Sequence, residues 1–141
     1  GKENETSRTN LDNKFDIIYK DINSSILITG LSVKPDESFI DKVINENKVN
    51  YKINIMHYPD EFDNIKKYNY DLVLAGHSHN GQIALPVYGA VITPENAKEY
   101  YKPYYKIDNT LFYISSGVGT TKFDYRFLNK PSFNLYRILK K

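Results

Sequence analysis

The feature that most constrains the fold of this chain is a short apolar run that ends in two closely spaced histidines. Residues 71–82 have the sequence D-L-V-L-A-G-H-S-H-N-G-Q, in which four apolar residues precede Gly76, His77 and His79. A short apolar run bounded by turn-forming residues is typical of a buried β-strand that opens into a loop. We therefore predict a strand that delivers both imidazoles to a loop at its carboxyl end.

The third histidine of the chain follows another predicted strand. His57 comes directly after the segment Y-K-I-N-I-M at residues 51–56. Neighbouring parallel strands bring their carboxyl ends to one edge of a sheet, and side chains at i and i+2 share one side of an extended segment. Neutral imidazole is also the commonest side-chain ligand of metals. We predict that His57, His77 and His79 bind metal, although a single histidine is more often structural or solvated.

The segments before His57 predict a hairpin and a helix. Residues 15–20 and 25–29 are rich in isoleucine and are joined by a turn so short that only antiparallel pairing is possible. Asp36 is a good helix N-cap, and Phe39, Ile40, Val43 and Ile44 form the apolar face of a helix that should end near Asn47. This helix connects two strands by a crossover, which gives a βαβ unit.

A second crossover should make the strands that end at His57 and His77 neighbours. Asp60 is predicted to cap a helix over residues 61–68, which lies between the two histidines. Asp71 follows this helix. It either stabilises the turn through its own hydrogen bonds or forms a hydrogen bond with a histidine that binds metal.

The remaining third of the chain is less regular. Residues 82–106 contain three prolines, and we expect little regular structure there beyond a short strand at 83–85. A buried strand at 111–115 leads into the glycine turn at 117–119, whose amides either contact substrate or only form a tight turn. The alternating segment 133–139 is predicted to be a final strand, with Phe133, Leu135, Arg137 and Leu139 on one face.

Four tyrosines within this irregular region have two interpretations. Tyr100, Tyr101, Tyr104 and Tyr105 are interleaved with three lysines, an arrangement that can stack on sugars or bases and attract phosphate. The alternative is a tyrosine-rich loop that packs on its own sheet, which the abundance of tyrosine throughout the chain favours.

Composition places the chain among single-domain globular proteins. Of its 141 residues, 40% are hydrophobic and 26% are charged, and it contains no cysteine that could form a disulfide. The net charge of +2 is not concentrated in a block that would indicate nucleic-acid binding. We expect residues 1–13 to be disordered and residues 14–141 to form one domain. The richness in Lys, Asn, Ile and Tyr is typical of AT-rich bacterial genomes.

At the histidine motifs the sequence resembles the calcineurin-like metallophosphoesterases, in the branch whose last motif is G-H-x-H-G-G-Q. Residues 76–82 match this motif with Asn80 where a glycine is usual, and H-Y-P-D at 57–60 resembles the branch's H-N-P-D segment. Residues 115–120 and Arg126 resemble its closing strand, glycine turn and arginine. The resemblance spans roughly residues 15–139.

The resemblance implies a two-metal site of which only part is present. By analogy His57 and His77 would bind one divalent ion and His79 the other, the ions being Mn, Fe, Zn or Mg. Asn80, Gly81 and Arg126 would lie on the substrate side. The family's first three motifs, D-x-H, G-D-x-x-D and G-N-H-[DE], are absent from these 141 residues. The catalytic residues are therefore unknown, and the chain would be the C-terminal half of the phosphoesterase domain.

The implied fold is α/β, a mixed sheet with flanking helices that forms one half of a four-layer αββα sandwich. The implied function is hydrolysis of phosphomonoester, phosphodiester or pyrophosphate bonds in a small molecule or lipid, with this half alone inactive. A hydrolase that completes its site with a separate N-terminal chain is a further possibility, and a non-enzymatic module using the Tyr/Lys-rich loop is the alternative. An uncovered sheet face predicts self-association. We expect a cytoplasmic protein, or one held at a membrane by an N-terminal anchor outside this sequence.

Overall fold

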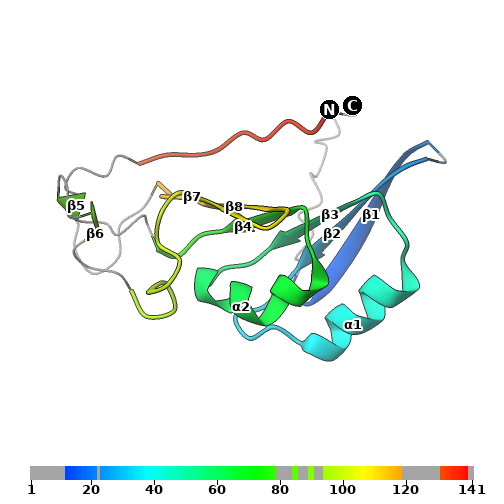
Figure 1. Ribbon diagram of the computed structural model, residues 1–141, viewed down its shortest axis with the longest axis horizontal. Coiled ribbons are helices and arrows are strands. Elements are labelled where there is room, and N and C mark those ends of the chain that lie inside the picture. The colour runs from blue at the N-terminus through cyan, green and yellow to red at the C-terminus, as the bar shows by residue number, and fades with distance from the viewer. Residues whose placement is uncertain are drawn as a thin grey trace, which may run out of the picture.

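A six-stranded sheet of mixed direction forms the centre of the chain (Figure 1). The computed structural model describes residues 12–21, 23–78, 84–85, 89–90, 94–118 and 131–139. The strands occur in the spatial order β1 (Lys14–Asp21), β2 (Ser24–Gly30), β3 (Tyr51–Ile55), β4 (Leu72–Ala75), β8 (Thr110–Ile114) and β7 (Tyr104–Ile107). Strands β2, β3, β4 and β8 are parallel, and β1 and β7 are antiparallel to their neighbours. Four carboxyl ends therefore share one edge of the sheet.

The predicted α/β fold with a mixed sheet is confirmed, and it is consistent with half of a metallophosphoesterase sandwich. The predicted hairpin is formed by β1 and β2, which pair Phe15 with Thr29 and Ile18 with Ile26. The predicted crossover through a helix also exists, because β2 and β3 are parallel neighbours. A separate pair of short strands, β5 (Ala84–Leu85) and β6 (Gly89–Ala90), contains most of the strand predicted near residue 84.

The first helix, α1 (Glu37–Glu46), begins as its sequence predicts. The Asp36 side chain accepts hydrogen bonds from the backbone N–H groups of Ser38 at 3.0 Å and Phe39 at 3.2 Å. These bonds satisfy two of the amides that a helix start leaves without partners, and they lower the pKa of Asp36. Ile40 and Val43 point from this helix into the core.

The second helix differs from its prediction in form and in capping. It consists of a 3₁₀ turn η1 (Pro59–Glu61), a single α-turn α2 (Phe62–Ile65) and a second 3₁₀ turn η2 (Lys66–Tyr68). The prediction that Asp60 caps this helix is wrong, because the Asp60 carboxylate accepts hydrogen bonds from a distant loop instead. Proline presets a φ that suits a first helical turn, so no capping side chain is needed here.

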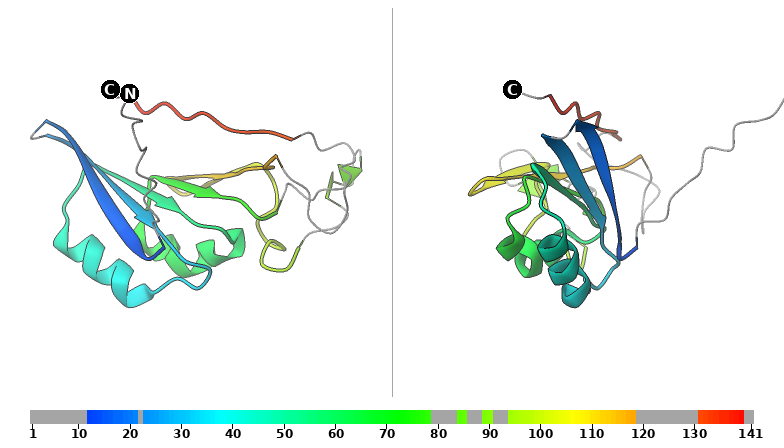
Figure 2. Two further views of the ribbon diagram at one scale, coloured as in Figure 1. Left: turned by 180° about the vertical axis from the view of Figure 1, so that it is seen from behind. Right: turned by 90° about the vertical axis from the view of Figure 1, so that its right-hand side faces the viewer.

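Both helices cover the same face of the sheet, as Figure 2 shows from two directions. The core lies between these helices and the sheet, with the Phe62 ring stacked on the Phe112 ring at a centroid distance of 4.8 Å. Three buried polar side chains form a line within this layer. Asn54 donates to the Thr29 hydroxyl at 3.0 Å, and that hydroxyl donates to the Tyr70 hydroxyl at 2.9 Å. Burial raises the pKa of Tyr70, so this phenol stays neutral.

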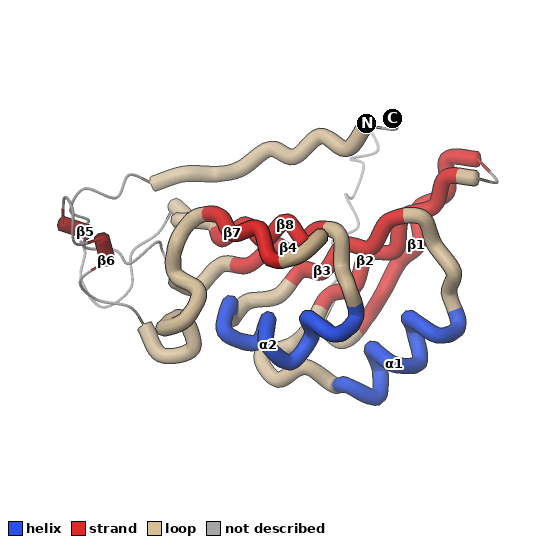
Figure 3. Tube along the Cα trace, in the orientation of Figure 1, coloured by secondary structure: helices blue, strands red, loops and turns tan. Residues whose placement is uncertain are grey.

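The described residues cover the opposite face of the sheet only in part. Residues 131–139 run across it as an extended loop, which Figure 3 shows on the side away from the helices. The Tyr136 ring contacts Tyr113 at 5.2 Å, whereas Phe133 and Leu135 are 86% and 92% exposed. The predicted final strand is therefore wrong. The side chains alternate as a strand's do, but the segment is assigned to no strand.

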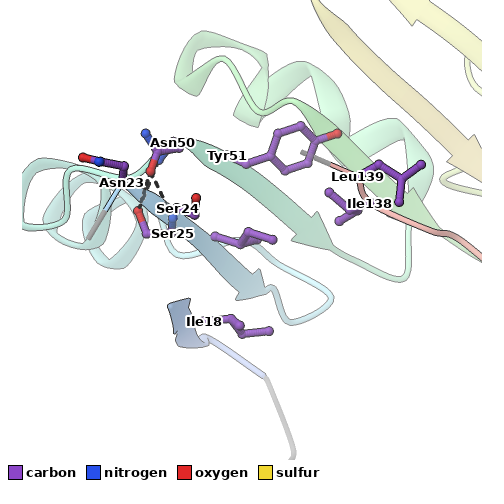
Figure 4. Close-up of a pocket in the computed structure, with 9 residues that line it drawn as sticks. Ile18, Asn23, Ser24, Ser25, Asn50, Tyr51, Ile138 and Leu139 are labelled. Carbon is purple, nitrogen blue, oxygen red and sulfur yellow. Dashed lines mark hydrogen bonds between the residues drawn. The ribbon is translucent and has the colours of Figure 1, made fainter. Parts of the chain in front are cut away.

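A hollow of about 280 Å³ opens on this face beside the hairpin (Figure 4). Ile18, Tyr51 and Ile138 line it, and beside them Asn50 accepts hydrogen bonds from the backbone N–H and the hydroxyl of Ser25 at 3.0 and 3.1 Å. The hollow is thus lined by residues of the hairpin and by Ile138 and Leu139.

Strand β7 was not expected from the sequence. It lies within the region that was predicted to be irregular, and it pairs with β8 through a turn at Asp108, whose φ is 50°. Its side chains alternate between exposed and half-buried, as on an edge strand. Helices long and apolar enough to cross a bilayer are not found among the described residues.

Tyr70→Phe should lower the free energy of unfolding by about 1 kcal/mol, because the buried Thr29 hydroxyl then loses its closest acceptor. Urea denaturation followed by circular dichroism measures this change. Tyr19→Phe is the matched control, since the Tyr19 side chain is largely exposed. Equal effects of the two substitutions would show that the buried line of polar groups contributes nothing to stability.

Candidate metal centre

The backbone holds His57 and His77 side by side beyond the ends of their strands. The Met56 amide donates to the Leu74 carbonyl at 3.0 Å, and the Gly76 amide donates to the His57 carbonyl at 3.3 Å. These bonds extend the β3–β4 pairing by one step on each strand. As a result, His57 Nε2 and His77 Nδ1 are 3.2 Å apart. The predicted proximity of these two histidines is confirmed.

The backbone of His77 has a conformation that is unfavourable for a residue with a Cβ. Its φ is 62°, in the left-handed region, and the Ser78 amide donates back to the Gly76 carbonyl at 2.7 Å. The other described non-glycine residues with positive φ are all Asn or Asp, which tolerate this region better than most. The turn also buries Ser78, which is 1% exposed. Strain of this kind, of order 1–3 kcal/mol, is concentrated at functional sites.

The second nitrogen of the His77 ring determines where its proton lies. His77 Nε2 is 2.8 Å from the Glu95 carbonyl oxygen, which can only accept a hydrogen bond. In the neutral ring the proton therefore sits on Nε2, and the lone pair of Nδ1 faces His57. A metal-binding histidine typically donates its other N–H to a carbonyl or carboxylate in this way.

The separation of the two ring nitrogens fits a single ion held between them. Two nitrogens bound at about 2.0–2.1 Å to a tetrahedral zinc ion stand roughly 3.3 Å apart. The observed 3.2 Å also allows the His57 Nε2–H to donate to His77 Nδ1 when no ion is bound. No group of three or more His, Cys, Asp or Glu side chains with metal-site geometry exists among the described residues. The described residues therefore do not form a complete metal site, and the binding of metal by His57 and His77 stays a prediction.

Two further residues have positions at this site that the sequence alone does not reveal. Tyr58, where H-Y-P-D departs from the family's segment, places its ring 4.5 Å from the His77 ring and 5.1 Å from the His57 ring. His57 and Asp12 both contribute to the lining of a hollow of about 240 Å³. Asp12 belongs to the segment predicted to be disordered, and only the fold shows that it lines the same hollow as His57.

Comparisons with known proteins find two curated relatives. The chain is 38% identical over 88 residues to YkuE, an uncharacterized metallophosphoesterase of Bacillus subtilis. These 88 residues cover 62% of this chain and 31% of YkuE. It is 30% identical over 66 residues to the phosphodiesterase YaeI of Escherichia coli, which covers 47% of this chain and 24% of YaeI.

The chain is thus similar to a metallophosphoesterase and to a phosphodiesterase, in line with the resemblance of its histidine motifs to the calcineurin-like metallophosphoesterases. Its matches span less than a third of the length of either curated relative. Neither a protein-family model nor a solved structure matches the chain.

Part of the predicted site lies outside the described residues. His79, Asn80, Gly81 and Arg126 belong to that part, so their roles stay predictions. The glycine turn after β8 is described as far as residue 118. Gly117 has a φ of 63°, as a tight turn requires, and its amide donates to the Ser115 hydroxyl at 3.0 Å.

Asp71 does not belong to the candidate site. Its carboxylate accepts a hydrogen bond from the Lys52 amide at 2.7 Å, at the start of β3 and β4 and hence at the opposite edge of the sheet from the histidines. The structural interpretation of Asp71 is confirmed, and support of a histidine by this residue is excluded by its position.

The tyrosine-rich loop packs largely on its own chain. The Tyr105 hydroxyl accepts hydrogen bonds from the amides of Tyr101 and Lys102, both at 2.9 Å. The Tyr100 hydroxyl donates to Asp63 at 3.0 Å, and burial together with this bond raises the pKa of Tyr100 to about 12. Tyr104, by contrast, remains exposed. The packing interpretation therefore holds for Tyr100 and Tyr105.

The strained backbone of His77 can be tested by comparing two substitutions that remove the same ring. We expect His77→Ala to be less stable than His77→Gly by about 1 kcal/mol, because only alanine keeps a Cβ at a φ of 62°. Urea denaturation measures both variants. At His57, whose φ is not positive, alanine should be at least as stable as glycine. The same order of stability at both positions would argue against strain at His77.

Proposed function

We propose that this chain is the C-terminal part of a metal-dependent phosphoesterase that hydrolyses phosphomonoester, phosphodiester or pyrophosphate bonds. The observation that carries the proposal is the convergence of His57 Nε2 and His77 Nδ1 within 3.2 Å at the carboxyl edge of the sheet. Ligand sites of open α/β sheets lie at this edge. The relatives YkuE and YaeI are named as a metallophosphoesterase and a phosphodiesterase, which supports the same reaction class.

In this proposal the chain contributes ligands and substrate contacts. His57 and His77 hold one of two divalent ions, and His79 holds the other. When bound, such ions neutralise phosphate oxygens and activate water. The Glu95 carbonyl keeps the His77 proton on Nε2 and so leaves Nδ1 available as a ligand. Asn80, Gly81 and Arg126 are the proposed substrate contacts, of which Arg126 can bind a phosphate group through two N–H donors.

The ligand set explains why we propose that these 141 residues alone are inactive. Two histidines on one ion and one on the other fall short of the three protein ligands of a typical catalytic zinc site. The remaining ligands would come from the part of the protein that matches the rest of the relatives' length, or from a separate chain. Either source would face the same edge of the sheet.

Metal binding by the histidines is testable without turnover. Isothermal titration of the chain with Zn²⁺ or Co²⁺ should show binding that is at least about tenfold weaker in His77→Ala, because one of two ligands on the ion is lost. Asp71→Asn is the matched control, since Asp71 lies at the opposite edge of the sheet. Equal affinity in all three proteins would argue against a site at His57 and His77.

The proposed inactivity is tested with a generic nitrophenyl phosphodiester in the presence of Mn²⁺. The 141-residue chain should release nitrophenol no faster than the buffer with metal alone, because its ligand set is incomplete. Metal-dependent hydrolysis that His79→Ala abolishes would show instead that these residues form a working centre.

A phosphorylated small molecule or lipid is the proposed substrate class, since the net charge of +2 provides no concentrated surface for nucleic acid. The non-enzymatic module ranks second, because the hydroxyls of Tyr100 and Tyr105 already have partners within the chain. The incompletely covered face of the sheet supports the proposed self-association, with Ile55 and Tyr104 among its exposed apolar side chains.

A further inference from the structure

The Asp60 carboxylate fastens a distant loop to the candidate metal centre. Its Oδ2 accepts a hydrogen bond from the Lys98 amide at 2.7 Å, and its Oδ1 accepts from the amides of Glu99 at 3.1 Å and Tyr100 at 3.0 Å. The Asp60 amide in turn donates to the Asn96 carbonyl at 3.2 Å. One aspartate thus makes four hydrogen bonds with residues almost forty positions away.

Asp60 holds a loop of residues 94–101, which we call the site loop. It contains a turn in which the Ala97 amide donates to the Pro94 carbonyl and Asn96 has a φ of 65°. Ala97 is 0% exposed, so the turn is seated on the core. A second attachment comes from Tyr100, whose ring packs on Phe62 and whose hydroxyl donates to Asp63. The site loop is therefore held in two ways: its backbone bonds to Asp60, and the side chain of Tyr100 contacts Phe62 and Asp63.

The site loop also contains the partner of His77. The Glu95 carbonyl that accepts from His77 Nε2 at 2.8 Å lies one residue before Asn96, whose own carbonyl is bound to the Asp60 amide. The position of this carbonyl decides which nitrogen of His77 carries the proton. Asp60 therefore acts on His77 through the backbone, without contacting the ring.

We propose that Asp60 is a positioning residue for the metal centre: by fastening the site loop, it fixes the Glu95 carbonyl against His77 Nε2 and keeps Nδ1 of the neutral ring free to bind an ion. The tautomer part of this inference concerns the metal-free chain. Only the effect on metal affinity rests on the proposed function. Asp60 follows His57 by three residues, so one short segment supplies both a proposed ligand and the support of its partner.

The test combines a nitrogen-resolved NMR measurement with metal titration. Long-range ¹H–¹⁵N spectra of the metal-free chain, in mildly alkaline buffer where imidazole is neutral, should show the His77 proton on Nε2. In Asp60→Asn one carboxylate oxygen is replaced by an NH₂ group that cannot accept from the loop amides. His77 should then populate both tautomers, and its affinity for Zn²⁺ should fall about tenfold.

Two control variants separate positioning from general destabilisation. Glu61→Gln makes the same type of change at the next residue, whose carboxylate accepts only from Asn64 among the bonds found for it. Asp71→Asn removes a carboxylate that accepts a backbone amide at the far edge of the sheet. Both variants should keep the wild-type tautomer of His77, and Asp71→Asn should do so even if its stability falls.

Two results would overturn the inference. One is a wild-type His77 that carries its proton on Nδ1. The other is a folded Asp60→Asn variant with the wild-type tautomer and affinity. If Asp60→Asn does not fold, Tyr100→Phe takes its place, because it removes the hydrogen bond from the site loop to Asp63. This variant should shift the His77 tautomers in the same direction as Asp60→Asn. An unchanged ratio of the two His77 tautomers in Tyr100→Phe would count against the proposal. If no variant binds metal, the proposed function fails while the tautomers still decide the role of Asp60.

Discussion

The candidate site depends on the parallel pairing of β3 and β4 continuing past the ends of the two strands. The bonds from Met56 to Leu74 and from Gly76 to His57 involve Met56, His57 and Gly76, which lie past the ends of β3 and β4. They bring together two histidines that are 20 residues apart in the chain. The His77 backbone then takes up a left-handed conformation, which the neighbouring hydrogen bonds must stabilise. The distance between the two imidazoles is therefore set by backbone hydrogen bonds at the edge of the sheet.

Local patterns predicted much of the fold correctly. The hairpin, the cap at Asp36 and the strands before His57 and His77 follow from short segments in which propensity, periodicity and turn residues agree. Strand β7 and residues 131–139 were wrongly predicted for opposite reasons. Proline and tyrosine hid an edge strand that pairs with β8, whereas residues 131–139 alternate like a strand but belong to none. Strand pairing is a tertiary property that a single segment does not reveal.

The candidate site was predictable only where residue type determines chemistry. Three histidines at strand ends together predict a metal site, and the proximity of His57 and His77 follows from a crossover connection. Asp60 shows the limit of such reasoning. An aspartate beside a predicted helix start is expected to cap that helix, yet this carboxylate binds amides of residues 98–100. The role of Glu95 had no signal in the sequence at all, because its contribution to the site is a backbone carbonyl, which every residue possesses.

The arrangement of helices on one face of the sheet has an evolutionary consequence. The histidines leave the sheet at its carboxyl edge, whereas the face that residues 131–139 partly cover lies across the strands (Figures 1 and 2). Substitutions on that face change side chains that project away from the helices, and the backbone bonds that align the edge do not pass through them. Lineages can therefore exchange whatever packs against the face, and thereby acquire new architectures, while inheriting the same pair of imidazoles.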